Sequence, residues 1–249
     1  MIERALKGID LVRKVVLDAG TGAGNATKYL AGQGCRVISV DLNQEYIDDA
    51  KTRLIEEELR RVEFHRSNLS EMRFLGDESV DVVVANQTLS TVESVTRFNT
   101  IPVLREFHRV LRRGGSLVVV DYHPFRYDET ATSRIHVELW RLHAAVAELL
   151  GEGHYLEYPV SWLRDRLSEI GFTDIEHSVL MEELSWSVEL LEEHRSELQP
   201  KIQAIPGGYL RQAMQRKLEE LLDEARGVEV RSGSMYLLKA LKPVDSSRP

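Results

Sequence analysis

The sequence contains a single cysteine, Cys35, among its 249 residues. One cysteine excludes an intramolecular disulfide and a cysteine-based metal cluster as supports for the fold. Cys35 stands at the start of an apolar run that ends at Val40, a position typical of a small residue packed in a core. A reactive thiol is the alternative interpretation.

Long apolar runs and an excess of positive charge are also missing. No run reaches the length of a signal peptide or of a membrane-spanning helix, so we expect a soluble, cytoplasmic protein that makes no membrane contact. The 32 basic and 40 acidic residues give a formal charge of −8, which argues against an extended electrostatic grip on nucleic acid. The composition indicates no particular oligomeric state.

The first half of the sequence alternates short apolar runs with helical patterns, as a parallel sheet covered by helices does. We predict strands at residues 14–18, 36–41, 62–66, 80–85 and 116–121, and helices at residues 25–32, 45–60 and 100–111.

The second half has a different organisation. Helical patterns cover residues 134–150 and 161–170, and two strands are predicted at residues 172–180 and 234–241. Between these strands, helical patterns at residues 187–198 and 209–225 flank a break at residues 200–208. We therefore expect a core at residues 1–126, a helical cap at 127–158, the end of the core sheet at 159–182 and 230–243, and a helical insertion at 183–229 that is a lid or a docking surface.

The most informative segment is Val15-Val-Leu-Asp-Ala-Gly-Thr-Gly-Ala-Gly-Asn25, in which a strand leads through Gly20, Gly22 and Gly24 into a helix. Glycines let the chain turn sharply and let its backbone approach a ligand closely. The free N–H groups that open the helix suit a carboxylate or a phosphate. Nucleotide, flavin and nicotinamide binders all share such a turn, and so does a tight turn without a ligand.

Two carboxylates narrow the choice of ligand. Asp41 ends the next strand, where it can accept hydrogen bonds from both hydroxyls of a ribose, which indicates a cofactor that contains adenosine. Asp18 precedes the first glycine, where a carboxylate repels a pyrophosphate and attracts a cationic amino group.

A second motif follows in the segment from Leu104 to Asp121, where a helix, the double-glycine turn Arg112-Arg-Gly-Gly115 and a buried strand succeed one another. With this motif, residues 15–121 resemble the class I (Rossmann-like) S-adenosylmethionine-dependent methyltransferases. In that family the glycine-rich turn, the acidic end of the second strand and the Leu-Arg-x-Gly-Gly turn occur in this order. The two late strands look like the sixth and seventh strands of the family, with the seventh antiparallel.

The resemblance implies a doubly wound α/β fold whose seven-stranded sheet is mostly parallel, with S-adenosyl-L-methionine as cofactor. It further implies that Gly20, Gly22 and Gly24 hold the methionine part of the cofactor, and that Asp18 orients its ammonium group. Asp41 would then hold the ribose.

The resemblance also assigns residues around the adenine. Leu42 would lie against one face of the ring. Family members often have an Asp after the third strand, where this sequence has Asn68 followed by Leu69. Asparagine still offers a carbonyl oxygen to the adenine amino group. The backbone of Asn86 could reach the ammonium group, while for Asn68 and Asn86 ordinary loop capping is an equal alternative.

Candidate residues for the methyl acceptor follow the fifth strand, in Tyr122-His-Pro-Phe125. His123 is the candidate general base because an imidazole titrates near neutral pH, and Tyr122 stands beside it. A surface histidine is the alternative. Trp140 shares a helical face with His136 and His143, which is either a half-buried face or a pocket wall, and no spacing indicates a metal site.

The sequence favours methyl transfer to a small molecule, with methylation of protein or RNA as the alternative. The turn after the fourth strand reads Ala85-Asn-Gln-Thr88, so the Asn-Pro-Pro-Tyr signature of amino-group methylation in DNA adenine or glutamine is absent. Two other classes compete. An NAD-dependent oxidoreductase gives no role to Asp18 or to the double-glycine turn, and a non-catalytic S-adenosylmethionine-binding subunit would dock through its insertion helices.

Overall fold

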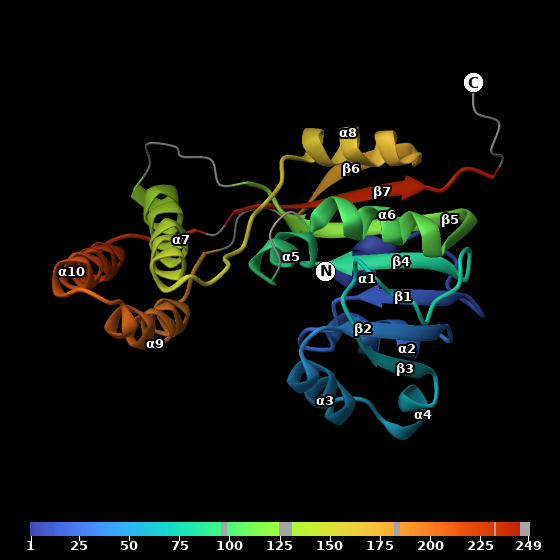
Figure 1. Cartoon of the computed structure of the whole chain (residues 1–249), viewed down its shortest axis with the longest axis horizontal. Coiled ribbons are helices and arrows are strands. Elements are labelled where there is room, and N and C mark those ends of the chain that lie inside the picture. The colour runs from blue at the N-terminus through green and yellow to red at the C-terminus, as the bar shows by residue number, and fades with distance from the viewer. Residues whose placement is uncertain (96–98, 125–130, 182–184, 232, 245–249) are drawn as a thin grey trace.

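The computed structural model describes residues 1–95, 99–124, 131–181, 185–231 and 233–244. Its centre is one seven-stranded sheet in the order β3-β2-β1-β4-β5-β7-β6 (Figure 1). β7 runs antiparallel to both β5 and β6, while β1 to β5 are parallel. The predicted doubly wound sheet with an antiparallel last strand is confirmed. The strands are β1 (Val15–Ala19), β2 (Arg36–Asp41), β3 (Val62–Arg66), β4 (Val80–Asn86), β5 (Leu111–Tyr122), β6 (Thr173–Met181) and β7 (Met235–Leu241).

Helices cover both faces of the sheet because the central strands are apolar on both sides. Leu17 packs into a core cluster with α6 (Thr100–Val110) and α8 (Val160–Ile170), and its neighbour Val16 packs into the opposite cluster with α1 (Ile2–Leu6) and α2 (Asn25–Gly32). Successive residues of a strand point to opposite faces, so an unbroken apolar run requires cover on both.

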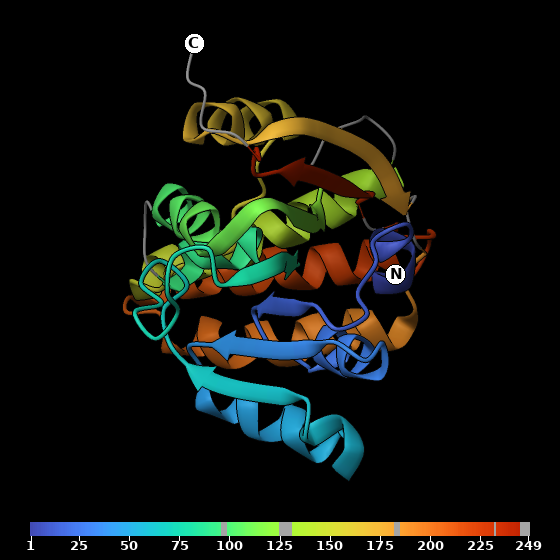
Figure 2. The ribbon, with the colours of Figure 1, turned by 90° about the vertical axis from the view of Figure 1, so that its right-hand side faces the viewer.

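Three helices form a separate bundle. α7 (Ala131–Leu150), α9 (Val188–Ala204) and α10 (Gly208–Ala225) pack together around a third core that includes Leu139, Ile202 and Leu221. Figure 1 shows this bundle beyond the end of the sheet toward which the β4 arrow points, and in Figure 2 the bundle lies behind the sheet. The first residues of the expected cap, 127–130, and of the expected insertion, 183–184, lie outside the described residues.

The helix predicted at residues 45–60 is two helices. α3 (Gln44–Thr52) ends before Leu54, which is buried, and α4 (Glu56–Leu59) begins anew. The Ile55 N–H donates to the Glu58 carboxylate at 3.0 Å, which caps the new start. Burial of Leu54 and this cap together outweigh the helical propensity of the continuous segment.

Further differences concern element ends. α9 continues through Pro200 to Ala204, past the predicted break, because Leu198 and Ile202 on either side of the proline are fully buried. α6 ends at Val110, and β5 starts at Leu111 instead of Ser116 because Leu111 pairs with Val80. α8 begins after Pro159. Two helices were not predicted, α1 and α5 (Leu89–Val95).

Candidate functional site

The glycine-rich turn joins β1 to α2 and has three residues in the left-handed region. Gly20, Gly22 and Gly24 have φ angles of 94°, 46° and 75°. A Cβ on Gly20 would lie 2.7 Å from the Thr88 hydroxyl oxygen, and one on Gly24 would lie 2.8 Å from the Ala50 Cβ. Nothing lies within 4 Å of a Cβ on Gly22. Neighbouring protein atoms therefore require glycine at two of the positions, while Gly22 borders open space.

A large cavity opens at this turn, and we call it the glycine-turn cavity. Its volume is about 910 Å³, and its walls come from the turn, the ends of β2 and β4, and α3. A smaller cavity of about 100 Å³, the side cavity, adjoins it and shares Asp41 and Leu42 with it. Together the two cavities gather residues from four loops, namely Gly20, Gly22, Asp41, Leu42, Asn68, Leu69 and Asn86.

Asp41 is fixed at the end of β2 by backbone donors. Its Oδ2 accepts from the Gly22 N–H and its Oδ1 from the Asn43 N–H, both at 2.9 Å. Each carboxylate oxygen can accept a further hydrogen bond. The carboxylate is thus held in a set orientation on the cavity wall with acceptor capacity left.

Asp18 lies under the turn and is not among the residues that line the cavity. Its Oδ2 accepts from the Thr27 hydroxyl at 2.5 Å and from the Ser39 hydroxyl at 3.2 Å, which ties β1 to α2 and β2. Burial raises the pKa of Asp18 to about 7, and its Oδ1 has no hydrogen-bond partner within the described residues. The carboxyl group therefore braces the turn from behind.

Two asparagines were predicted to touch a cofactor. Asn68 Oδ1 accepts from the Ser70 N–H at 3.0 Å, the Ser70 hydroxyl at 2.9 Å and the Asn99 amide at 3.3 Å, which is the loop-capping alternative. Asn86 differs, because its buried Oδ1 has no partner among the described residues and it lines the glycine-turn cavity.

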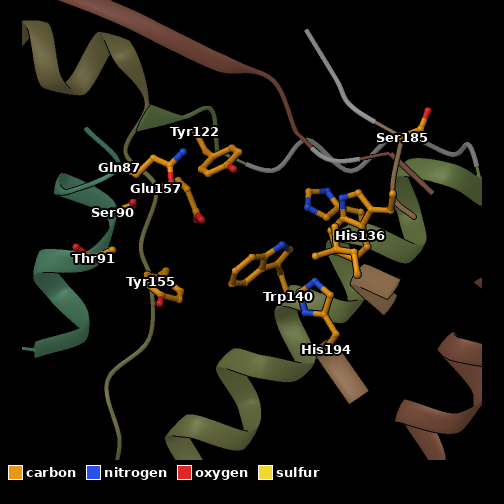
Figure 3. Close-up of a pocket in the computed structure, with 12 residues that line it drawn as sticks. Gln87, Ser90, Thr91, Tyr122, His136, Trp140, Tyr155, Glu157, Ser185 and His194 are labelled. Carbon is orange, nitrogen blue, oxygen red and sulfur yellow. The ribbon is translucent and has the colours of Figure 1, made fainter. Parts of the chain in front are cut away.

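A third cavity lies between the carboxyl end of the sheet and the helical bundle. We call this cavity of about 430 Å³ the aromatic cavity. Figure 3 shows Tyr122 and Glu157 on the sheet side, facing Trp140 and His136 of α7. The aromatic side chains on its wall are Tyr122, His136, Trp140, Tyr155, Trp186 and His194.

The aromatic cavity and the glycine-turn cavity meet at three residues. Gln87, Thr91 and Tyr155 line both of them. Gln87 follows β4 directly with a φ of 55°, and its N–H donates to the Val120 carbonyl at 2.7 Å. A non-glycine residue in this left-handed conformation stores strain, which is often found at functional sites.

Similarity to known proteins identifies the first half of the chain. Residues 17–119 match a family model described as a methyltransferase domain. The chain carries a class I S-adenosylmethionine-dependent methyltransferase domain. An arsenite methyltransferase of Halobacterium salinarum is 32% identical over 112 residues, which are 43% of this chain and 27% of that protein. A magnesium-protoporphyrin O-methyltransferase of Rhodobacter capsulatus is 40% identical over 80 residues, which are 32% of this chain and 34% of that protein.

A solved structure extends the likeness of fold. Haemonchus contortus phosphoethanolamine N-methyltransferase 2, solved with S-adenosylhomocysteine, aligns with a TM-score of 0.60 at 18% identity. The alignment covers 97% of this chain and 51% of that one. The chain spans only 27% and 34% of the length of these two curated relatives, so their likeness concerns the methyltransferase domain alone.

The two predicted catalytic residues lie in different surroundings, one at the aromatic cavity and the other away from it. Tyr122 lines the aromatic cavity. His123 is not among the lining residues, because its N–H donates to the Ser234 carbonyl at 2.9 Å and its ring packs against Tyr236 at a centroid distance of 5.2 Å. The expectation of His123 as general base at the acceptor finds no support in this position.

Sequence reasoning missed several residues of the aromatic cavity. Tyr155 and Glu157 belong to the extended segment between α7 and α8, and Trp186 and His194 belong to the insertion. None of the four stands in a motif. His136 and Trp140 were considered as a pocket wall, and they line the cavity, while His143 lies behind it and bonds His194 at 3.0 Å.

Burial sets the protonation of these groups. It lowers the pKa of His136 and of His194 to about 4, and proximity to a second histidine adds to the effect, so both rings are neutral at neutral pH. Burial raises the pKa of Glu157, and the neighbouring charge of Asp121 raises it further.

No helix in the described part of the chain has both the length and the apolar character to cross a membrane. Over the same residues, no three His, Cys, Asp or Glu side chains are grouped so that they could hold a metal ion.

Proposed function

We propose that the protein transfers the methyl group of S-adenosylmethionine to a small organic molecule held in the aromatic cavity. The observation that carries this proposal is the meeting of the two cavities at Gln87, Thr91 and Tyr155. Methyl transfer is an in-line displacement, so donor and acceptor must approach the same carbon from opposite sides. A donor cavity that opens directly onto an acceptor cavity meets this requirement.

The residues around the glycine-turn cavity fit the donor. The open space beside Gly22 admits the methionine part, and Gly20 and Gly24 shape the turn that holds it. Asp41 has the free acceptor capacity that two ribose hydroxyls need. Leu42 and Leu69 supply apolar surface in the side cavity for the adenine.

The contact between the Asn86 backbone and the ammonium group of the donor stays a prediction. It is supported by the place of Asn86 on the wall of the glycine-turn cavity and by its side-chain Oδ1, a buried acceptor with no partner among the described residues. Asp18 supports this end of the site through Thr27 and Ser39, and its direct contact with the ammonium group stays a prediction. The contact between Asn68 and the adenine amino group also stays a prediction, since its carbonyl oxygen already accepts three hydrogen bonds.

Bound S-adenosylmethionine supplies a methyl group that its sulfonium already activates. The protein then has to orient the acceptor and keep water away from the reacting atoms. Tyr122 and Gln87 offer hydrogen-bonding groups on the wall of the aromatic cavity, and Gln87 also lines the glycine-turn cavity. The rings of Trp140 and Trp186 displace water from the far wall.

The aromatic cavity favours an organic small molecule over the other acceptors. Cys35 is buried, bonds the Leu30 carbonyl at 3.0 Å and lies outside the cavity, so no thiol among the described lining residues would hold a metalloid. A cavity of about 430 Å³ behind a helical cap suits a compact ligand better than a segment of protein or RNA. The cytoplasmic location expected from the composition stays a prediction.

Calorimetry separates this function from its competitors. We expect S-adenosylhomocysteine to bind the isolated chain and NADH not to bind. Binding of NADH without S-adenosylhomocysteine would replace the proposal with an oxidoreductase. A chain that binds S-adenosylhomocysteine, transfers no methyl group alone and does so only in a stable complex with another protein would be a partner subunit.

A further inference from the structure

The aromatic cavity has an uneven distribution of charge. Glu157 is the one formally charged side chain among the described residues that line it, and no lysine or arginine of the described chain lines it. In Figure 3 its carboxylate is directed into the space between Tyr122 and Trp140. The cavity therefore presents one negative group to a bound molecule and surrounds it with rings.

A second carboxyl group reinforces this negative character. Asp121 is buried at the end of β5, where its oxygens accept from the Ser90 and Tyr122 N–H groups, each at 2.9 Å. Burial raises the pKa of Asp121, and in its ionised form its charge acts on Glu157 and on Tyr122. The neutral rings of His136 and His194 bring no compensating positive charge to the wall. His154 acts on Glu157 in the opposite direction to Asp121, but it does not line the cavity and lies 3.7 Å from the Glu148 carboxylate.

Four rings of electron-rich type complete the cavity. Trp140 and Trp186 come from the helical bundle side, and Tyr122 and Tyr155 from the sheet side. Indole and phenol faces attract cations, and the attraction grows where water is displaced. Trp186 also stacks on His194 at a centroid distance of 4.6 Å with an interplanar angle of 11°, which fixes one ring in place.

We propose that the methyl acceptor is a small organic amine whose ammonium group binds between the Glu157 carboxylate and these rings. This inference rests on the proposed methyl transfer. An anionic acceptor would meet Glu157 without a cationic partner, and a neutral alcohol or phenol would leave the charge of Glu157 uncompensated in a half-buried site. An ammonium group compensates that charge, and its organic body packs against Trp140 and Trp186.

The reaction balances with Glu157 as proton acceptor. The bound ammonium gives one proton to the Glu157 carboxylate, and the freed nitrogen lone pair forms the new N–C bond. The C–S bond of the donor breaks and its electron pair stays on sulfur, which leaves S-adenosylhomocysteine and the methylated ammonium. Glu157 then returns its proton to water. Burial and Asp121 raise the pKa of Glu157, which narrows the difference between this pKa and that of the ammonium group and so makes the proton transfer less costly.

Tryptophan fluorescence tests the inference, because two of the three tryptophans line the aromatic cavity. The protein is saturated with S-adenosylhomocysteine and titrated with phenethylamine, phenethyltrimethylammonium, 2-phenylethanol and 3-phenylpropanoate, which share one apolar body. We expect both cations to bind about tenfold or more tightly than the alcohol, and the carboxylate to bind most weakly.

Two variants locate the effect. Glu157→Gln should weaken binding of both cations about tenfold and leave 2-phenylethanol unchanged. Glu152→Gln is the matched control, because Glu152 pairs with Lys201 at 3.1 Å and does not line the cavity, so it should change neither affinity. Unchanged affinity of Glu157→Gln for S-adenosylhomocysteine shows that this variant is folded.

A pH titration of the original protein and of Glu157→Gln separates Glu157 from His136 and His194 on the same wall, whose protonation also changes in acid. Only the original protein should show the part of the change due to Glu157. Phenethyltrimethylammonium has no proton to lose, so its affinity should rise with pH as Glu157 ionises. Four outcomes would overturn the amine acceptor. The cations could bind no more tightly than the alcohol, or less tightly than the carboxylate, or not at all at millimolar concentration, or Glu157→Gln could leave cation binding unchanged. Failure of S-adenosylhomocysteine to bind would instead overturn the methyltransferase proposal.

Discussion

At the scale of single residues, the three glycines of the turn have different reasons to be glycine. Gly24 is confined by the protein, since its added Cβ would lie 2.8 Å from the Ala50 Cβ and 3.0 Å from the Ala50 Cα. Gly22 has no neighbour within 4 Å of its added Cβ and borders the glycine-turn cavity. The first serves packing, and the second leaves room for a ligand.

This difference predicts that alanine at Gly24 mainly lowers stability, whereas alanine at Gly22 mainly weakens ligand binding. Gly24→Ala should lower the free energy of unfolding by about 2–4 kcal/mol, because it adds a steric clash to a left-handed backbone. Gly22→Ala should cost only about 1 kcal/mol of stability and mainly weaken S-adenosylhomocysteine binding. Urea unfolding and calorimetry measure the two quantities, and equal effects of both substitutions on binding would contradict the assignment.

Asp41 should contribute directly to cofactor affinity. Asp41→Ala removes a charge-assisted contact to the ribose and should cost about 1.5–3 kcal/mol, which is about tenfold or more in the dissociation constant of S-adenosylhomocysteine. Asp48→Ala is the control, because Asp48 pairs with Lys51 on the exposed side of α3. If the folded Asp41→Ala variant binds as tightly as the original, the ribose does not lie at Asp41.

Asp18 should make the stability of the domain depend on pH. Its pKa of about 7 lies above the ordinary value of 3.8, so the folded state holds a proton that the unfolded state releases. The contribution of Asp18 to stability is therefore full below pH 3.8 and falls as the pH rises to about 7. The Asp18→Asn variant keeps the shape of the side chain, but its amide cannot ionise.

The free energy of unfolding of Asp18→Asn, minus that of the original protein, should consequently increase between about pH 4 and pH 7 and then level off. Urea unfolding at a series of pH values measures the difference. A difference that stays constant over this range would mean that the buried carboxyl group ionises normally.

At the scale of elements, the bundle helices α7 and α9 are joined by histidines. His143 on α7 bonds His194 on α9 at 3.0 Å, and His136 lies edge-on to Trp186 at a centroid distance of 4.9 Å. Burial lowers the pKa of all three histidines to about 4, below the ordinary 6.5. Protonation therefore opposes the packing of the two helices.

This packing should loosen in acid. Each histidine contributes stability that is present above pH 6.5 and is lost as the pH falls toward about 4, the opposite direction to Asp18. We expect the fluorescence of Trp140 and Trp186 to change between pH 6.5 and 4, and His143→Gln to reduce the change. A transition of the same size in His143→Gln would exclude this histidine as its cause.

The elements also show how far the sequence could predict the structure. The parallel strands and the glycine turn follow local rules, namely apolar runs buried on both faces and glycines with positive φ, so their positions were predicted. The helical break near Leu54 and the passage of α9 through Pro200 depend on tertiary burial, which a local pattern does not contain. The double-glycine turn matched the family but lies at the start of β5, where Gly115 packs against the Asp81 carbonyl, and its residues line none of the three cavities described above.

The cofactor side of the site was predictable to the extent that its residues are close in sequence to a strand end. Gly20, Asp41 and Asn86 each end or directly follow a strand, and parallel strands bring these ends to one edge. The aromatic cavity was not predictable in the same way. Its wall combines residues from segments as far apart as Gln87 and His194, and only the folded bundle brings them together.

At the scale of the whole molecule, the sheet and the helical bundle divide the two proposed binding tasks. The glycine-turn cavity is built mainly on strand ends, while the far wall of the aromatic cavity is built on α7 and α9. The bundle has its own core, in which Leu221 is 1% exposed. Damage to that core should therefore affect acceptor binding and spare cofactor binding.

Leu221→Ala tests this division, with Leu167→Ala as its counterpart in the core of the sheet, where Leu167 is also 1% exposed. Each substitution leaves a cavity and should cost about 2–5 kcal/mol of stability. Leu221→Ala should weaken phenethyltrimethylammonium binding, because Trp186 packs on this core and α7 and α9, which carry Trp140 and His194, are built around it, and should leave the affinity for S-adenosylhomocysteine unchanged. Leu167→Ala should change neither affinity at temperatures where it remains folded. If Leu221→Ala weakened both ligands equally, the bundle would be part of the cofactor site and the division would be wrong.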